Sequence, residues 1–164
     1  MKILPKEIKE NIFKLIGDDW MLITAGNKEN LNTMTASFGG FGIFCFKNVA
    51  HIYVRPERYT YNFLENNDYF SLSFFDNSFK EKLAYCGKVS GKNENKIKRC
   101  GFDTLFTTNE TPYFKQAKLT IICKKMYAQN IDEKCFIDKS AFEKTYSSGG
   151  MHKMYIGEIL EIIE

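Results

Sequence analysis

The chain has the size and composition of one ordinary globular domain. It contains 164 residues, of which 44% are hydrophobic and 26% charged, so neither a disordered chain nor a fibre is indicated. The net charge of +3 suits an anionic ligand, but the lysines are scattered, which argues against a nucleic-acid partner. The many phenylalanines and tyrosines favour a β-rich fold, because aromatic side chains fit pleated, half-buried surfaces.

The first half of the chain predicts one helix followed by several strands. Apolar residues at helical spacing follow Pro5 and predict a short amphipathic helix that ends at Gly17. Strands at 20–25 and 33–38, with an Asn- and Gly-rich turn between them, predict a hairpin. The glycines within 39–42 allow sharp bends or a close backbone approach. Three further elements are predicted, namely a strand at 49–54, a helix at 59–67 and a strand at 69–75.

The second half predicts short helices and two late strands. The helices are expected at 78–85, 93–100 and 140–146, and the strands at 119–128 and 154–163. In total the sequence predicts six or seven strands, and they do not alternate regularly with helices as the strands of a doubly wound sheet do. No repeat or linker divides the sequence. We therefore predict a single domain over residues 1–164, mainly β with short flanking helices, and a barrel as its architecture.

The cysteines and the N-terminal segment indicate a cytoplasmic protein. The five cysteines form no CxxC pair, and only two histidines could join them, so a structural zinc site is not expected. The first ten residues become charged before any apolar run develops, unlike a signal peptide. No stretch reaches the length of a membrane span. We expect free, mostly buried thiols, a reducing compartment, and neither membrane nor nucleic acid as a partner.

The segment 55–60 (RPERYT) is the strongest candidate for an anion site. It places Arg55, Arg58 and Thr60 directly after a predicted strand and at the start of a predicted helix. A guanidinium offers paired donors to phosphate oxygens, and the free N–H groups of a helix start add to such a site. The alternative is that both arginines lie on the surface and pair with Glu57 or Glu65.

A second candidate is the segment 32–37 (NTMTAS), which is followed by glycines. Small side chains at Thr35, Ala36 and Ser37 would let a flat heteroaromatic ring approach the backbone. The alternative is an ordinary β-strand with a Gly-rich turn.

A third candidate is the segment 86–96. Gly87 and Gly91 flank Ser90, whose hydroxyl and neighbouring N–H groups suit a phosphate or a ring edge, and Lys96 would add a point charge. The alternative is a helix end, a turn and the next helix start. Neither a P-loop nor a GxGxxG segment is present. Cys86 is expected to be a small buried side chain, since no second cysteine lies near it in the sequence.

Five blocks in a fixed order resemble one known family. They are WxLITAG (20–26), NxMTAS (32–37), YVRPERYT (53–60), CGxxSGxxxxK (86–96) and HxxYIGEI (152–159). Together they run from about Trp20 to the C-terminus. The sequence is similar to the flavin reductase-like FMN-binding split-barrel family, and within it to the flavoredoxin-like branch.

The resemblance implies a homodimeric split β-barrel that binds FMN non-covalently near the subunit interface. It places the isoalloxazine edge at the backbone of Thr35, Ala36 and Ser37, within the block that begins at Asn32. His152 would lie near the flavin and assist the docking of nicotinamide or substrate. The chain departs from the family at Phe38, where tryptophan is common, and at Met151, where aspartate is common. The phosphate and ribityl end would meet Arg55, Arg58, Thr60, Ser90, Gly91 and Lys96.

The resemblance further implies an oxidoreductase. Bound FMN would be reduced by NADH or NADPH, and the electrons would pass to free flavin, ferric complexes or a partner protein. Two alternatives remain at this point. One is a flavoredoxin-like FMN electron carrier without nicotinamide activity of its own, and the other is a structural or ligand-sensing barrel that has lost the flavin.

Overall fold

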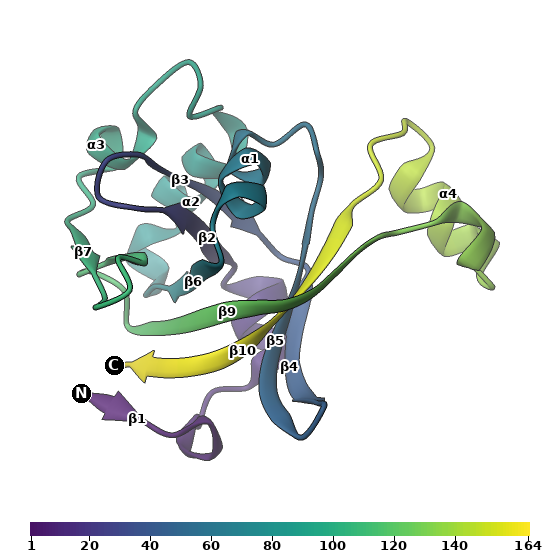
Figure 1. Ribbon diagram of the computed structural model, residues 1–164. Helices are drawn as coiled ribbons and strands as arrows, with labels where there is room; N and C mark the ends of the chain where they lie inside the picture. Colours follow the sequence, from purple (N-terminus) through teal and green to yellow (C-terminus); the bar gives the residue numbers. More distant parts are fainter.

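The computed structural model describes residues 1–164 and is dominated by one antiparallel sheet that curls into a barrel (Figure 1). Its strands are β1 (Lys2–Ile3), β2 (Met21–Gly26), β3 (Leu31–Ala36), β4 (Gly39–Phe44), β5 (Lys47–Val54), β6 (Tyr69–Phe74), β9 (Leu119–Asn130) and β10 (Lys153–Ile163). They follow the order β3–β2–β6–β9–β10–β5–β4, and β1 pairs with the end of β10. A separate hairpin consists of β7 (Thr104–Phe106) and β8 (Pro112–Phe114).

The barrel is open between two strands that are consecutive in the chain. β3 and β4 stand at opposite ends of the strand order, although only Ser37 and Phe38 separate them. β3 pairs only with β2, and β4 pairs only with β5. The chain therefore crosses the opening at Ser37 and Phe38. This arrangement confirms the predicted class, a mainly β split barrel with short helices.

The long strands β9 and β10 bend around the core. Their register shifts between Ile156 and Gly157 and again between Ile159 and Glu161, and such bulges increase the local bend and twist of a strand. A cluster of 19 buried residues fills the barrel. Gly157 lies against this cluster, because a Cβ atom there would stand 2.8 Å from two ring atoms of Phe70.

Four α-helices flank the barrel. They are α1 (Tyr59–Asn66), α2 (Lys80–Lys88), α3 (Lys96–Cys100) and α4 (Lys139–Tyr146). A second apolar cluster lies outside the barrel core and joins α2 and α3 to the sheet. Its members are Leu22, Phe75, Leu83, Cys86, Cys100, Phe102 and Phe114. No helix is long and apolar enough to cross a membrane.

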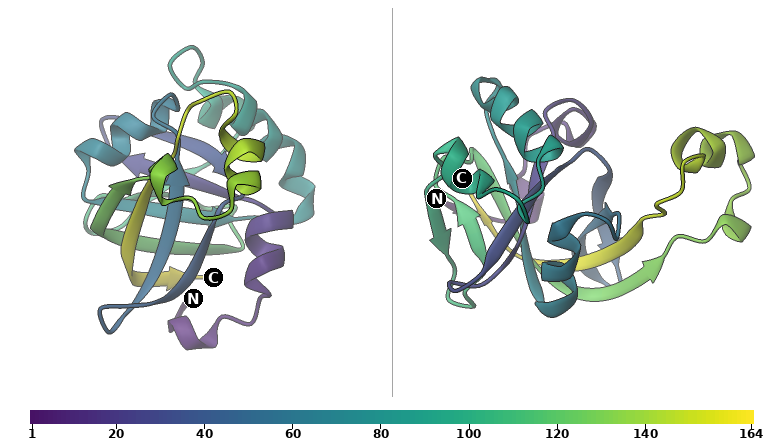
Figure 2. Two further views of the ribbon diagram at one scale, coloured as in Figure 1. Left: turned by 90° about the vertical axis from the view of Figure 1, so that its right-hand side faces the viewer. Right: turned by 90° about the horizontal axis from the view of Figure 1, so that it is seen from above.

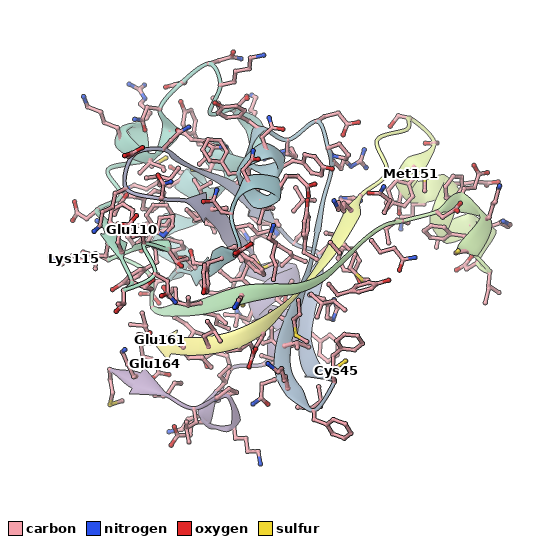
Figure 3. The ribbon with its side chains drawn as sticks, viewed as in Figure 1. Cys45, Glu110, Lys115, Met151, Glu161 and Glu164 are labelled. Carbon is pink, nitrogen blue, oxygen red and sulfur yellow. The ribbon has the colours of Figure 1, made fainter.

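One helix stands apart from the others. Residues 131–152, between β9 and β10, form an arm that projects from the barrel and contains α4, which lies clear of α1, α2 and α3 (Figure 2). The arm returns to the barrel through the segment that contains Met151, which is labelled in Figure 3. The backbone N–H of Ile131 donates to the carbonyl of His152 at 2.9 Å and closes the arm at its base.

The predicted N-terminal helix is wrong as a continuous element. The structure has a 3₁₀ turn at Pro5–Glu7 and a separate π-helical turn at Lys14–Asp18. The side chain of Asn11 accepts hydrogen bonds from the backbone N–H groups of Phe13 and Lys14. A side chain that caps these N–H groups starts a new helical turn there rather than continuing an earlier one.

The glycine segment 39–42 forms a strand rather than a set of bends. It belongs to β4, and β4 pairs with β5 through a tight turn at Cys45 and Phe46, both with positive φ. This turn geometry matches the twist of hairpin strands, and Figure 3 labels Cys45 at the tip. The predicted close approach is confirmed, because a Cβ atom on Gly40 would stand 2.6 Å from Nε2 of His51. The strands β1, β4, β7 and β8 were not predicted.

The cysteines are all free, as predicted, and three of the five are buried. Although no cysteine is near Cys86 in sequence, the fold brings the sulfur of Cys100 to 3.7 Å from that of Cys86. Burial, together with the neighbouring Cys100, raises the pKa of Cys86 to about 12. Its thiol therefore stays protonated and unreactive at neutral pH.

Candidate functional site

Two adjoining cavities lie where the ends of β3 and β5 meet the helices. The strand cavity, about 230 Å³, opens beside Ser37 and Phe38. The loop cavity, about 140 Å³, lies between the start of α1 and the 87–91 turn. Both are lined by Arg58, so one elongated ligand can occupy them together.

The structure gathers the residues that the sequence singled out. Six of them line the strand cavity, namely Thr35, Ala36, Ser37, Arg55, Arg58 and His152. The loop cavity is lined by Arg58, Thr60, Ser90, Gly91 and Lys96. Asn32 lies next to this group and faces an outer cavity of about 470 Å³, which it shares with Gly91 and Lys96. Segments far apart in the sequence therefore converge on one region.

Arg58 occupies the junction of the two cavities. It is the N-cap residue of α1 and has extended backbone dihedrals, φ −72° and ψ 129°. Its guanidinium makes no hydrogen bond or ion pair with another residue, and Glu65 bonds instead to Lys153 and Tyr155. Burial lowers the pKa of Arg58, yet an arginine stays charged at neutral pH. A half-buried cation without a partner favours an anionic ligand.

Arg55 has a different environment from Arg58. Its Nη2 donates to the carbonyl of Thr145 at 3.0 Å and its Nη1 to the carbonyl of Gly149 at 3.2 Å. These bonds fasten the α4 arm to the end of β5. Arg55 thus lines the strand cavity and not the loop cavity, whereas the resemblance implied a place at the phosphate end.

Lys96 holds the 86–91 turn in place. Its Nζ donates to the carbonyls of Cys86 and Val89, at 2.8 and 2.9 Å. An ammonium group has three N–H donors, so one is left for a ligand. Burial lowers the pKa of Lys96 to about 8, and the nearby charge of Arg58 acts in the same direction.

Asn32 joins the turn to the barrel. Its Nδ2 donates to Oγ1 of Thr60 at 2.9 Å, which links β3 to α1. Its Oδ1 lies so close to the Gly91 backbone that a Cβ atom there would stand 2.0 Å away. Gly91 is therefore required for this approach. Ser90 is exposed, and its hydroxyl accepts a hydrogen bond from the backbone N–H of Lys92.

His152 lines the strand cavity together with Thr35 and Ser37. Its ring lies 5.6 Å from that of Phe38, and its Nδ1 is 2.8 Å from the hydroxyl of Tyr146. Burial lowers the pKa of His152, and the charge of Arg55 lowers it further. The ring is therefore neutral at pH 7. Sequence reasoning did not find Tyr146, because it belongs to none of the five blocks.

The fold and its cavities define a split barrel with a basic, turn-lined binding region. A family model for the flavin reductase like domain matches residues 15–164. The chain belongs to this flavin reductase-like family of flavoproteins. No curated protein matches the sequence significantly.

Solved structures share the same fold. The flavoredoxin of Methanosarcina acetivorans is 19% identical, with a TM-score of 0.69 over 100% of this chain and 74% of that one. The FMN-binding protein of Thermus thermophilus, with bound 1-cyclohex-2-enone, is 16% identical, with a TM-score of 0.69 over 100% and 77%. The NADH:FAD oxidoreductase SgcE6 of Streptomyces globisporus C-1027 is 13% identical, with a TM-score of 0.65 over 89% and 75%.

Proposed function

We propose that the protein binds FMN and acts as an NAD(P)H-dependent flavin oxidoreductase, which passes electrons to free flavin, ferric complexes or a partner protein. The isoalloxazine ring would lie in the strand cavity and the phosphate in the loop cavity. When bound, FMN supplies the redox chemistry, and the protein binds and orients it. Family membership supports the flavin, and the nicotinamide step is part of the proposal.

The unpaired guanidinium of Arg58 is the observation that supports this proposal most directly. It stands where the two cavities meet, half-buried and without a protein partner. The free donor of Lys96 lies in the same loop cavity, so two cations are available to one phosphate. Charge-assisted hydrogen bonds of this kind are short and strong.

The strand cavity suits a flat ring that gains electrons. Two arginines and no carboxylate line it, and such a lining stabilises negative charge on a ligand. The Thr35 hydroxyl donates to the carbonyl of Leu83, so this side chain is already engaged and a ring would meet the neighbouring backbone. Ala36 and Ser37 leave room for that approach.

We also propose that the protein is a cytoplasmic homodimer with its flavin sites near the interface. Large apolar side chains at the tip of the β4–β5 hairpin support a partner there, since Ile43 is 72% exposed and Phe46 fully exposed. Exposed apolar groups of this kind mark association surfaces when they are contiguous. Sedimentation analysis of the purified protein tests the dimer, and a monomer at micromolar concentration would contradict it.

Rapid mixing with reduced nicotinamides tests the activity. The flavin-loaded protein is mixed anaerobically with NADH and, separately, with NADPH, and the flavin absorbance is followed. We expect fast bleaching with at least one of the two. A flavin that binds but does not bleach indicates the flavoredoxin-like carrier instead. A protein that retains no flavin contradicts both.

Lys96 is expected to make FMN binding depend on pH. Its pKa of about 8 means that the free protein loses this charge as the pH rises through that value, so FMN affinity should fall between about pH 7 and about pH 9.5. The Lys96→Met variant should bind FMN more weakly at pH 7 and lose this pH dependence. Fluorescence titration of FMN at several pH values measures both.

The same pKa shift has an opposite effect on stability. Because the folded value of about 8 lies below the ordinary lysine value of 10.5, the folded state disfavours the charged form. The resulting penalty is fully present below pH 8 and disappears as the pH rises toward 10.5. A rise in pH through about 8 should therefore weaken FMN binding and, through Lys96, begin to stabilise the flavin-free protein.

A further inference from the structure

The hydrogen bond between the α4 arm and His152 determines where the proton of the imidazole lies. We propose that Tyr146 is a positioning residue that holds His152 in the neutral tautomer with its proton on Nε2, so that an N–H donor faces the strand cavity. The ligand group that this donor recognises is a carbonyl-type acceptor. Only the identity of that ligand, a flavin or its substrate, rests on the proposed function.

One ring nitrogen of His152 contacts Tyr146, and the other is left for a ligand. The Tyr146 hydroxyl is 2.8 Å from Nδ1 of His152, and both residues are more than nine-tenths buried. Nε2 has no hydrogen-bond partner within the protein, and the His152 ring lines the strand cavity. An accessible ring nitrogen without a protein partner is available to a ligand in this cavity, and the state of Nδ1 decides whether it donates or accepts.

The direction of the Tyr146–His152 bond follows from the basicity of the two atoms. A neutral imidazole nitrogen is protonated with a pKa near 6.5, so its lone pair is a far stronger acceptor than a phenol oxygen. The Tyr146 oxygen also faces the backbone N–H of His152, which opposes the rise of the Tyr146 pKa caused by burial. Because Nδ1 is the stronger acceptor, the hydroxyl proton points to Nδ1.

Neighbouring charges keep the pair neutral. Arg55 lies 5.7 Å from the centroid of the Tyr146 ring and is bonded to the carbonyls of Thr145 and Gly149 on either side of it. Glu57 faces His152 from the β5–α1 connection and acts in the opposite direction to Arg55. A second cation beside Arg55 would be costly in this buried position. His152 therefore presents a neutral N–H and not a positive charge.

This arrangement makes the arm part of the binding site. Tyr146 lies in the last turn of α4, and the chain returns to His152 through Gly149 and Gly150, both with positive φ. Arg55 and Tyr146 thus fix the arm and the imidazole together. The two arginines already supply positive charge to this cavity. The neutral N–H of His152 adds a directed hydrogen-bond donor without further charge, and such a donor suits a carbonyl oxygen.

Nitrogen NMR of the histidine rings tests the proposal in the flavin-free protein. The chain has only two histidines, so after ¹⁵N labelling the His152 ring is assigned by comparison with the His51 ring. At neutral pH we expect Nδ1 of His152 at the shift of an unprotonated nitrogen and Nε2 at that of a protonated one. The Tyr146→Phe variant should lose this preference and show averaged shifts.

Two controls separate positioning from general disruption. Phe142→Leu alters a ring on the same helix face, 5.7 Å from Tyr146, and should leave both histidine spectra unchanged. His51 should be unaffected in Tyr146→Phe. Protonation of Nδ1 in the unmodified protein overturns the proposal by itself, even if the variant fails to fold. An unchanged His152 spectrum in a folded Tyr146→Phe variant overturns it as well. Neither measurement requires flavin, so a failure of the proposed reductase activity would leave this result intact.

Discussion

Replacing Arg58 with alanine is expected to weaken FMN binding by about 10- to 100-fold while changing riboflavin binding far less. The guanidinium has no protein partner to lose, so the change removes only contacts to the ligand. Hydrogen bonds to charged groups contribute about 1.5–3 kcal/mol, and 1.4 kcal/mol corresponds to a factor of ten. Titration with both flavins, followed by fluorescence, separates the phosphate contribution from that of the ring.

Arg99→Ala is the matched control for this experiment. Arg99 carries the same charge on α3, but its side chain is 73% exposed and lies 4.0 Å from Glu94. Loss of its charge should leave the affinities for both flavins unchanged, apart from a small effect that salt removes. If Arg58→Ala lowered the affinities for FMN and riboflavin equally, Arg58 would contact the ring instead of the phosphate. An unchanged affinity for FMN would show that Arg58 does not contact the ligand.

The second large effect is expected at Gly157, where alanine should destabilise the fold by about 1–3 kcal/mol. The new Cβ atom would stand 2.8 Å from two atoms of the Phe70 ring and 2.9 Å from Cβ of Cys123. Both neighbours are fully buried in the barrel core. The core must therefore shift or force side chains out of their rotamers. Urea denaturation should show a lower midpoint with an unchanged slope.

Gly42→Ala provides the comparison for Gly157→Ala. Gly42 also lies in a strand, but nothing stands within 4 Å of a Cβ atom there. This change should be close to neutral, because alanine reduces the freedom of the unfolded chain without strain in the folded one. A second variant that combines Gly157→Ala with Phe70→Leu should recover part of the loss. Equal stability of the two single variants would contradict the close packing at Gly157.

The strands that carry strong patterns were predictable from the sequence. The segment 49–54 is rich in β-formers and ends before Pro56, and β5 ends at Val54 as predicted. The segment 69–75 alternates, and β6 covers all but its last residue. That Arg58 and Thr60 line one cavity was predictable for a similar local reason, since both residues follow shortly after β5.

The remaining features depend on contacts between distant residues. The role of Arg55 is set by the carbonyls of Thr145 and Gly149, about ninety positions away, and no local pattern encodes such a bond. The glycines of β4 form a strand only because β5 supplies the hydrogen-bonding partner. The start of α3 at Lys96 and not at residue 93 follows from Asn95, whose side chain accepts from the N–H of Lys98. Each outcome reflects tertiary or capping contacts that override periodicity.

The position of β10 in the sheet governs the order in which the protein can fold during synthesis. β10 lies between β9 on one side and β5 with β1 on the other, and every one of these partners precedes it in the chain. A nascent chain that lacks β10 therefore holds two separate sheet fragments, one ending at β9 and one at β5. Their unpaired edges can template wrong associations, and long-range pairing of this kind is slow. The addition of β10 is thus the step that joins the fragments, and until then their unpaired edges favour aggregation of the nascent chain.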